Sequence, residues 1–490
     1  MAAGRKPAEA GADFRHRLVP QGCRESSAGR GCAMSALGDS LILGTGPAAV
    51  QLAVLLRRQL SIRVGIAGRS SPRSRSFFAA LAQGDGALVA DVQNAAHREL
   101  GGTCMLDAWH EGYDRIEGEW PTLVLAVTAD AYVPVLEQLP PSVLKAARCL
   151  VLVSPTFGSG SLVGQLLQRL QPAARPEVVS FSTYLGDTRW PDGRPGSRAV
   201  TTGVKRKVFI GSSCGRSSAV MEELQGACAR SGIAMEALES PLAAETRNIS
   251  LYVHPPLFMN EFALEAVFSL ESDRVQTYVY KLYPEGPITP SLIRDMRSCW
   301  LEISAIVQAI GLRPINLLRF MTEECYPVRP QSLSSEELER FPELDAVHQQ
   351  YLLYIRYASL LIDPFSEPDG QGRYFDFSAV PIRSLAVNDE GRWEVPRMPK
   401  EDYYRTAILQ GIARRLGVPT PTIDRLLGLY ESRLAQARAQ LAAQALSEAF
   451  YPGGHEAELE LIVRGLPDRS RLFFDPISGA SAPIQEEEIH

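Results

Sequence analysis

The sequence predicts an α/β fold in which an N-terminal doubly wound parallel sheet precedes a mostly α-helical second half. Three observations predict this fold. Short apolar runs alternate with amphipathic stretches over residues 38–240, a glycine-rich turn directly follows the first run, and long helical patterns dominate after Pro241. Strands that alternate with helices at these spacings are typical of βαβ units. The chain of 490 residues is long enough for two to three domains, and we expect two, at 34–240 and 241–490.

Each element of the first half follows from its hydrophobic pattern. Residues 40–43 form a strand-like run, and residues 50–60 form a helix with Leu52, Leu55 and Leu56 on one face. Continuous short apolar runs of this kind are typical of buried parallel strands. Further strands are predicted at 62–67, 123–127, 150–153, 178–181, 208–210 and 235–238, with helices at 162–170 and 219–231.

The second half has helical periodicity and is interrupted by proline and glycine. Helices are predicted at 262–268, 291–310, 345–361, 403–416 and 422–450. Prolines and glycines near 284–287 and 363–372 separate them. A mostly helical domain that packs beside the sheet is the natural interpretation.

Charge and cysteine content exclude several classes of protein. The chain has 50 Lys and Arg against 56 Asp and Glu, a net charge of −6, which argues against a nucleic-acid binder that depends on an overall basic field. None of its eight cysteines forms a C-x-x-C pair, so we expect reduced thiols in a cytoplasmic protein and no metal site. No apolar run approaches the ~20 residues that span a bilayer, so we expect no membrane association.

The first 33 residues differ from the rest of the chain. They contain six Lys or Arg and three Asp or Glu, are rich in Ala, Gly and Ser, and have neither hydrophobic periodicity nor the apolar core of a secretory signal. We expect residues 1–33 to be a disordered extension that activity does not require.

The strongest local motif is Gly44-Thr45-Gly46-Pro47-Ala48-Ala49. It fits G-x-G-x-x-G/A, in which the first glycine permits a tight turn and the second lets the backbone approach a pyrophosphate. The third small residue allows close packing of helix on strand, and the helix N-terminus faces the anion. The alternative is an ordinary glycine-rich turn, but the position after the first strand favours a Rossmann-type dinucleotide site.

The end of the second predicted strand indicates which dinucleotide binds. An NAD enzyme typically places Asp or Glu there for the ribose 2′-hydroxyl, whereas this chain has Arg69, Ser70, Arg73 and Arg75. Guanidinium and hydroxyl groups can hydrogen-bond a 2′-phosphate that an acid would repel. A solvated basic loop is the alternative, but together with the glycine motif the pattern predicts NADPH.

Polar residues follow the next two predicted strands. Thr128 and Asp130 come after one strand and Pro155 after the other. The carboxyl ends of the strands border the ligand crevice of a doubly wound sheet, so we expect these residues on the nicotinamide side. Each could equally belong to an ordinary turn.

A reductase that acts on C=O or C=N needs a proton donor near pH 7, and histidine has a suitable ordinary pKa. Of the seven histidines, His254 alone follows the predicted domain junction and has polar, aromatic and proline neighbours. It is therefore the candidate general acid, and a structural histidine is the alternative.

Taken together, several longer segments resemble one known family. They lie at 43–47, 128–132, 154–159, 180–189, 244–260, 283–289, 326–330, 361–365 and 374–381. On these segments the chain resembles the opine metallophore dehydrogenases, the staphylopine and pseudopaline synthases. The likeness runs from about residue 41 to beyond residue 433, which is most of the chain.

The resemblance implies an activity. Enzymes of this family use NADPH to join a histidine-derived, nicotianamine-like amine to an α-keto acid through an imine, and the secondary amine formed is a metal chelator. The metal is bound by the product and not by the enzyme, and a homodimer is implied. Matched residue by residue, Gly44 and Gly46 hold the pyrophosphate and Arg69 and Arg75 contact the 2′-phosphate.

Two further matches concern the substrates. His254 matches the proposed general acid/base, and Asp187 matches the acidic residue that faces the substrate. Within the family, a carboxylate at this position goes with pyruvate and a small neutral residue goes with 2-oxoglutarate, so we expect pyruvate. The alternatives are 2-oxoglutarate, another two-domain NADPH reductase, or a non-catalytic NADPH-binding sensor.

Overall fold

The computed structural model describes residues 35–271, 274–325, 328, 331–359 and 377–467. The expected extension at 1–33 lies outside these residues, as does the segment 361–365. Of the segment at 326–330 only residue 328 is described, and of the segment at 374–381 residues 377–381 are described. No helix within the described part of the chain is long and apolar enough to cross a membrane.

The main sheet has eight strands in the order β12-β11-β8-β7-β6-β1-β2-β5. Its strands are β1 Ser40–Leu43, β2 Val64–Gly68, β5 Ala108–Glu111, β6 Thr122–Leu125, β7 Cys149–Leu152, β8 Glu177–Phe181, β11 Lys207–Ser212 and β12 Ala234–Leu238. The neighbours from β8 to β5 are parallel, with Leu41 opposite Leu123 where β1 meets β6. The predicted α/β class is confirmed, and the sheet order changes direction at β1 as in a doubly wound fold.

The sheet is nevertheless not parallel throughout. β11 runs antiparallel to β8, with Ile210 opposite Phe181, and β12 runs parallel to β11. The chain leaves the sheet after β8, forms two further strands and returns on the same edge, so β11 enters in the reverse direction. The hydrophobic periodicity of residues 208–238 is the same for a strand that runs antiparallel to its neighbour as for a parallel one, so the sequence does not indicate the direction of β11.

A second sheet, absent from the sequence prediction, has the strand order β4-β3-β10-β9. Its strands are β3 Ala87–Val92, β4 Gly102–Met105, β9 Gly186–Arg189 and β10 Arg198–Val204. Hydrogen bonds tie β9 to its surroundings: the Tyr184 hydroxyl donates to the Gln51 amide oxygen over 2.6 Å, and the Thr188 and Thr201 hydroxyls lie 2.9 Å apart. These contacts fix the strand that carries Asp187.

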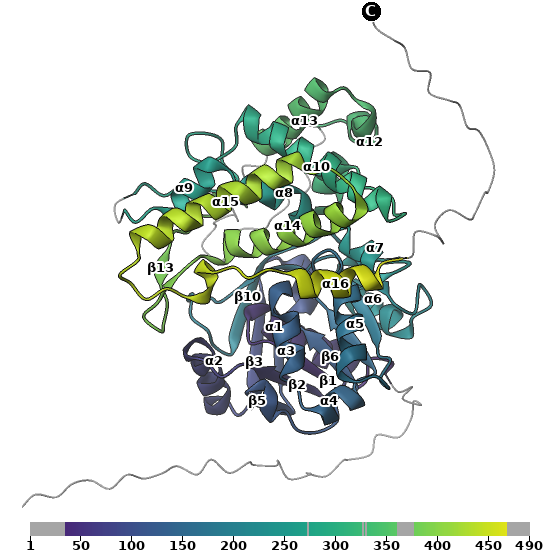
Figure 1. Ribbon diagram of the computed structural model, residues 1–490. Coiled ribbons are helices and arrows are strands. Elements are labelled where there is room, and N and C mark those ends of the chain that lie inside the picture. Colours follow the sequence, from purple (N-terminus) through teal and green to yellow (C-terminus); the bar gives the residue numbers. More distant parts are fainter. Residues whose placement is uncertain (1–34, 272–273, 326–327, 329–330, 360–376, 468–490) are drawn as a thin grey trace, which may run out of the picture. The chain divides into compact units, whose positions relative to one another are not determined.

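Helices cover both faces of the main sheet (Figure 1). Val124 of β6 packs in the same core as Val50 of α1, whereas the next residue, Leu125, packs with Leu162 of α5. Neighbouring strand residues point to opposite faces, so each face has its own core. Helices of this half are α1 Pro47–Leu60, α2 Pro72–Gln83, α3 Tyr132–Glu137, α4 Pro141–Ala146, α5 Ser159–Leu170, α6 Ala219–Arg230 and α7 Pro241–Glu245; the 3₁₀ turns are η1 Ala95–Leu100, η2 Tyr113–Arg115 and η3 Ala129–Ala131.

The remainder is mostly helical, as predicted. Its longer helices are α8 Ile249–Phe258, α9 Glu261–Phe268, α10 Pro290–Ala309, α13 Ala346–Ser359, α14 Arg397–Leu416, α15 Pro421–Gln440 and α16 Glu456–Gly465. Short elements are α11 Leu317–Arg319, the π-helical turn η4 Phe320–Cys325, α12 Ser335–Arg340, η5 Phe341–Glu343, η6 Phe377–Ala379, η7 Glu448–Phe450 and the strands β13 Ala386–Val387 and β14 Trp393–Glu394. α10 and α14 both pack on α8, so the helix that carries His254 is central to this half.

Some helices differ from the prediction in their bounds or were not predicted. The expected helix at 422–450 ends at Gln440 and is followed by a turn, although the Ala/Gln-rich sequence beyond it is rich in helix-forming residues. α14 begins at Arg397, six residues before the expected start at Tyr403, and this extra turn carries most of the buried charge described below. α16, which was not predicted, returns to the sheet-containing half and packs on α5 (Figure 1).

Candidate active site

The glycine loop joins β1 to α1 with the geometry that the motif predicts. Gly44 has φ +136°, and a Cβ there would lie 2.5 Å from the Ala126 carbonyl oxygen, so only glycine fits. Gly46 is the N-cap of α1 and Pro47 its first residue. A Cβ on Gly46 would meet no protein atom within 4 Å, so this face of the loop is open to a ligand. The buried Ala49 completes the pattern of small residues.

Thr45 packs the loop onto the end of the neighbouring strand. A Cβ on Gly68 would lie 2.3 Å from the Thr45 methyl carbon, so the glycine that ends β2 lets the two turns approach each other. The residues after Gly68 are thereby held beside the loop, which is where a ribose 2′-substituent would lie in a dinucleotide fold.

The basic cluster surrounds the N-terminus of α2. Ser71 caps this helix with Ser74 in a reciprocal capping box. Arg69, Arg73 and Arg75 are exposed around it, and the guanidinium groups of Arg73 and Arg75 form no hydrogen bond or ion pair with other described residues. The positive end of the helix and the arginines together suit an anion.

One acidic residue near this cluster escaped sequence analysis. The Ser70 hydroxyl donates to Oε1 of Glu111, the last residue of β5, over 3.0 Å. Glu111 lies 43 positions beyond Gly68 in the sequence, so only the pairing of β2 with β5 brings it here. Ser70 must exchange this partner if it is to donate to a phosphate.

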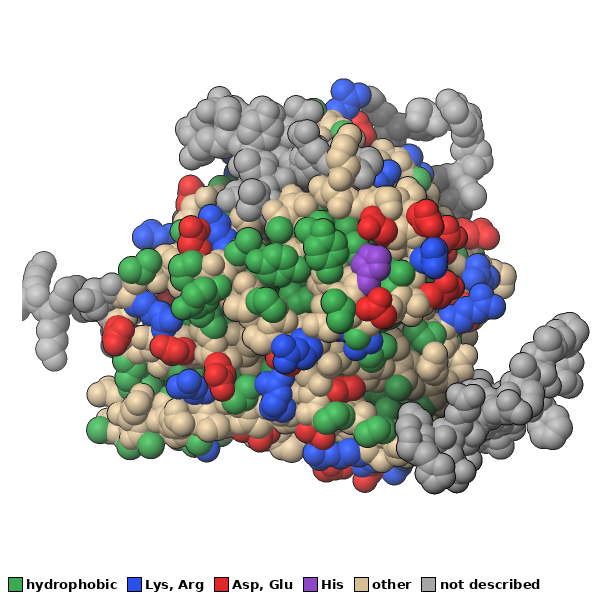
Figure 2. Space-filling view, turned by 90° about the horizontal axis from the view of Figure 1, so that it is seen from above, with side chains coloured by type: hydrophobic (Ala, Val, Ile, Leu, Met, Phe, Trp, Pro, Cys, Tyr) green, Lys and Arg blue, Asp and Glu red, His purple; other side chains and the backbone are tan. Residues whose placement is uncertain are grey.

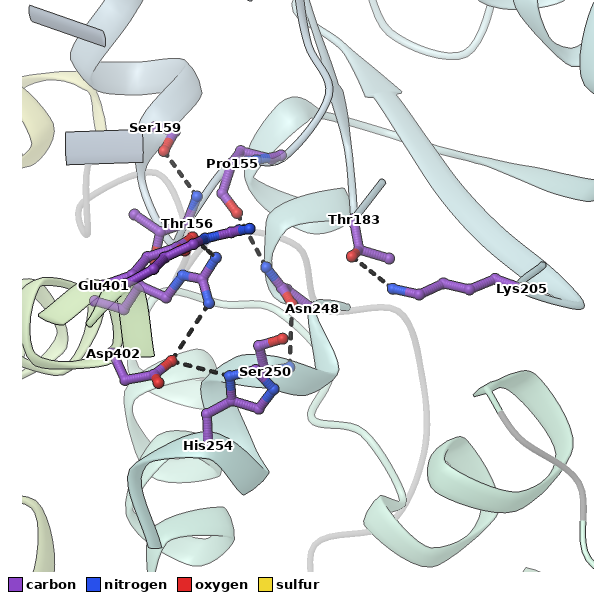
Figure 3. Close-up of polar contacts among 12 residues, drawn as sticks. Pro155, Thr156, Ser159, Thr183, Lys205, Asn248, Ser250, His254, Glu401 and Asp402 are labelled. Atoms are coloured by element: carbon purple, nitrogen blue, oxygen red, sulfur yellow. Dashed lines mark hydrogen bonds and ion pairs between the residues drawn. The ribbon is translucent and has the colours of Figure 1, made fainter. Parts of the chain in front are cut away.

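The residues after β6 and β7 lie at the carboxyl edge of the sheet. Thr128 precedes the turn η3, and Oδ1 of Asp130 is buried without a partner in the described part of the chain. The Pro155 carbonyl accepts a hydrogen bond from Nδ2 of Asn248 over 3.0 Å, as Figure 3 shows. Pro155 therefore contacts the helical half through its backbone, and its predicted contact with cofactor stays a prediction.

His254 projects from α8 and pairs with a carboxylate on α14. Its Nδ1 lies 2.9 Å from Oδ1 of Asp402, and the two side chains point toward each other in Figure 3. Only 8% of His254 and 1% of Asp402 is exposed, and the Phe258 ring packs against the imidazole with 5.1 Å between ring centroids. With Asp402 ionised, Nδ1 carries the hydrogen and Nε2 is the nitrogen left for proton exchange.

The buried carboxylates of α14 form an ion-pair network behind this histidine. Nη1 of Arg405 lies 3.5 Å from Oδ1 of Asp402, and Arg405 also bonds Glu401. Nε of Arg397 bonds the second oxygen of Glu401 over 2.6 Å. Burial alone would raise the pKa of Glu401, but Arg405 and Arg397 outweigh it and lower the pKa to about 2. The network thus holds Glu401 ionised and fixes the turn of helix beneath His254.

Arg397 connects this network with the other candidate residue, Asp187. The side chain of Arg397 is 64% exposed although its Nε is held by the buried Glu401. Asp187 is likewise exposed at its surface, but the surrounding protein limits its hydration and raises its pKa, while Lys205, Arg189 and Arg397 lower it.

Lys205 also lies on this side of the molecule. Its ammonium donates to the Thr183 hydroxyl over 2.6 Å (Figure 3). The charges of Lys205, Arg189 and Arg397 act on Asp187, and the charge of Arg397 also interacts with that of Asp402.

A glycine loop at the switch point of a doubly wound sheet, faced by a His–Asp pair from a helical half, defines a two-part dehydrogenase of the dinucleotide-binding class. The chain belongs to the staphylopine dehydrogenase family, whose model matches residues 38–466. It is therefore an oxidoreductase of the opine dehydrogenase type, as the sequence predicts.

Three relatives illustrate the similarity. The staphylopine synthase of Staphylococcus aureus is 44% identical over 434 residues, which cover 87% of this chain and 98% of the relative. The pseudopaline synthase of Pseudomonas aeruginosa is 39% identical over 417 residues, which cover 85% and 94%. The solved structure of NADP⁺-bound yersinopine dehydrogenase superposes with a TM-score of 0.80 at 30% identity, covering 88% of this chain and 99% of that one.

Sequence reasoning missed Asp402, Glu401, Arg397 and Arg405. The only signal was four charged residues spaced for one helical face, three of them just before the helix predicted to start at Tyr403 and Arg405 within it. Charges at i and i+4 are usually solvated, so their burial could not be read from the pattern.

Proposed function

We propose that this protein is an NADPH-dependent opine metallophore synthase. It condenses a histidine-derived, nicotianamine-like amine with an α-keto acid, pyruvate in preference to 2-oxoglutarate, and reduces the resulting imine to a staphylopine-like chelator. The observation that carries the proposal is the His254–Asp402 pair, coupled through Arg397 to Asp187. The similarity to staphylopine and pseudopaline synthases over most of the chain supports it.

The chain offers a site that fits NADPH. The open face of Gly46 and the N-terminus of α1 would take the pyrophosphate, with Gly44, Thr45 and Pro47 shaping the turn. Arg69, Ser70, Arg73 and Arg75 would take the 2′-phosphate, and Thr128, Asp130 and Pro155 would lie toward the nicotinamide. When bound, NADPH supplies the hydride that reduces the imine carbon.

His254 moves the proton in this mechanism. Formation of the imine from amine and ketone requires loss of water, and this loss is aided by a group that gives a proton to the departing oxygen. Nε2 of His254 is suited to that task because Asp402 occupies Nδ1, orients the ring and stabilises the imidazolium. Asp402 acts on the reaction through His254 and is a positioning residue.

Arg397 and Asp187 select the keto acid. Arg397 is held at Nε by Glu401, so its two Nη groups can donate hydrogen bonds to a carboxylate in bidentate geometry. Asp187 faces the same region and would repel a second carboxylate, which 2-oxoglutarate has and pyruvate lacks. This balance favours pyruvate.

We also propose the organisation that the sequence predicts: a dispensable extension at 1–33, a cofactor domain at 34–240 and a substrate and dimerisation domain at 241–490, in a cytoplasmic homodimer. Apolar side chains gather near the middle of the face of the helical half in Figure 2, with charged side chains around them. Exposed apolar residues of these helices include Leu301, Val347 and Tyr351. Such a patch supports a subunit interface, and light scattering of the full chain would measure the dimer.

The proposed activity is tested by supplying enzyme, NADPH, the amine, and equal concentrations of pyruvate and 2-oxoglutarate. We expect NADPH oxidation only when amine and keto acid are both present, and mass spectrometry should show mainly the pyruvate-derived secondary amine. Oxidation without the amine would point to a simple ketone reductase, and a predominant 2-oxoglutarate product would overturn the assigned keto acid. Absence of any turnover while NADPH still binds would favour a sensor.

A further inference from the structure

A pocket separate from the candidate active site opens at the far edge of the main sheet. It has a volume of about 290 Å³ and lies where β11 and β12 meet the α7–α8 junction and the α11–η4 turn. Its lining includes Lys207, Phe209, Glu236, Arg247, Arg319 and Phe320. None of these residues belongs to the cofactor loop or to the His254 region.

The pocket is lined by more positive than negative charge. Lys207 and Arg319 each have an acidic partner: Nζ of Lys207 lies 2.6 Å from Glu236, and Nε of Arg319 lies 2.7 Å from Glu323. Arg247 has no carboxylate partner among the described residues. The whole chain has a net charge of −6, so the unpaired positive charge of Arg247 does not simply reflect an excess of basic residues in the sequence.

The backbone of Arg247 is held between two anchored neighbours. The Glu245 carboxylate accepts hydrogen bonds from the backbone amides of Gly158 and Gly160, over 2.9 and 2.7 Å. On the other side, Asn248 caps α8 and bonds the backbone of the β7 loop. Arg247 is therefore presented from a fixed position, so little backbone entropy is lost when it binds a ligand.

The guanidinium of Arg247 lies over an aromatic floor. Its central carbon is 5.8 Å from the centroid of the Phe209 ring, and the Phe209 and Phe320 rings stack with 6.1 Å between centroids at 17°. Stacking on a ring engages the face of a guanidinium and leaves its N–H edge for hydrogen bonds. That edge matches the two oxygens of a phosphate or carboxylate.

We infer that this pocket is a binding site for a small oxyanion, a phosphate or carboxylate compound, held mainly by Arg247 with Lys207 and Arg319 adding to the positive field. The volume admits a phosphate ester or a dicarboxylate and is too small for a dinucleotide. The inference does not depend on the amine or keto acid of the proposed reaction, because none of the pocket residues takes part in it.

The test uses the full chain saturated with NADPH, so that the Arg69–Arg75 cluster is occupied. Inorganic phosphate and malonate are titrated separately by calorimetry. We expect at least one of them to bind saturably at one site. Arg247→Met should weaken this binding at least tenfold, and Arg247→Lys should weaken it less. Arg216→Met is the matched control, since Arg216 pairs with Glu239 outside the pocket.

Each outcome decides the inference. Phosphate binding alone assigns a phosphate compound, and malonate binding alone assigns a carboxylate. Binding that is equal in wild type and both Arg247 variants, or absence of binding by both probes, would overturn it. Thermal melting of each variant checks that it is folded, and Arg247→Lys preserves the test if Arg247→Met does not fold.

Discussion

Replacement of Asp187 by asparagine should change the choice between the two keto acids. Two like charges ~5 Å apart repel by about 3 kcal/mol at an effective dielectric constant of ~20. Asp187 is exposed and faces Lys205 and Arg189, so solvent and these cations reduce the repulsion to roughly 1.4 kcal/mol. The kcat/KM ratio of 2-oxoglutarate to pyruvate should therefore rise about tenfold in Asp187→Asn.

The same reasoning predicts a pH dependence. The pKa of Asp187 is raised, mainly because the surrounding protein limits the hydration of its charged form, so it takes up a proton at a higher pH than an ordinary aspartate. As the pH falls, wild-type Asp187 becomes neutral and the 2-oxoglutarate to pyruvate ratio should rise toward that of Asp187→Asn. The variant itself should show no such trend.

Steady-state NADPH oxidation with each keto acid, measured from pH 5 to 8, provides the assay. Asp192→Asn, an exposed aspartate in the loop between β9 and β10, is the matched control and should leave the ratio unchanged. An unchanged ratio in Asp187→Asn, or an equal loss for both keto acids, would refute the electrostatic explanation.

Three further predictions concern the cofactor, the proton and the buried charges. The double variant Arg69→Asp, Arg75→Ala should raise the KM for NADPH more than tenfold, because it removes two guanidinium groups that would hydrogen-bond the 2′-phosphate and adds an acid that repels it. An unchanged KM would remove these residues from the cofactor site. His254→Gln should abolish turnover, and Asp402→Asn should lower kcat about 10- to 100-fold because the charge-assisted hydrogen bond to His254 is lost. Fluorescence titration should show unchanged NADPH affinity in both variants. Retained turnover in His254→Gln would exclude His254 as the acid. Glu401→Gln should cost about 3 kcal/mol of stability in urea unfolding at pH 7, because it removes the carboxylate that pairs with the buried Arg405.

The last of these predictions has a definite pH signature. The folded-state pKa of Glu401 is lowered to about 2, so its ionised form stabilises the fold above its ordinary pKa near 4.5. That stability is lost as the pH falls from about 4.5 toward about 2. The difference in unfolding free energy between wild type and Glu401→Gln should therefore shrink over this window, and a constant difference would contradict the assigned ion pairs.

Local patterns in the sequence predicted the elements that depend on neighbouring residues. The strand at Ser40–Leu43, the glycine turn and the helix after it follow from apolar periodicity and from the backbone freedom of Gly44, and all three are present. The end of α15 at Gln440 was missed because helix propensity continues beyond it, and tertiary packing ends the helix first.

The reversed strand β11 and the second sheet could not be predicted for a different reason. Strand direction is set by where the chain re-enters the sheet, and β9 has only four residues, with alternating exposure and no apolar run. Which strand pairs with which depends on residues that are far apart in the sequence, so a short stretch of sequence does not reveal the pairing.

The sequence by itself determined that this chain has a dinucleotide loop, a basic cluster beside it and a candidate histidine, because each of these depends on residues that are close in the chain. Only the tertiary structure decided that His254 is paired with Asp402, 148 positions away, and that the charge of Arg397 acts on both Asp402 and Asp187. It also decided that Arg247 lies over Phe209 in a separate pocket. The physical reason is that burial and ion pairing depend on which surfaces pack together in the folded protein. A sequence pattern shows that a residue is charged but does not show which residue it pairs with.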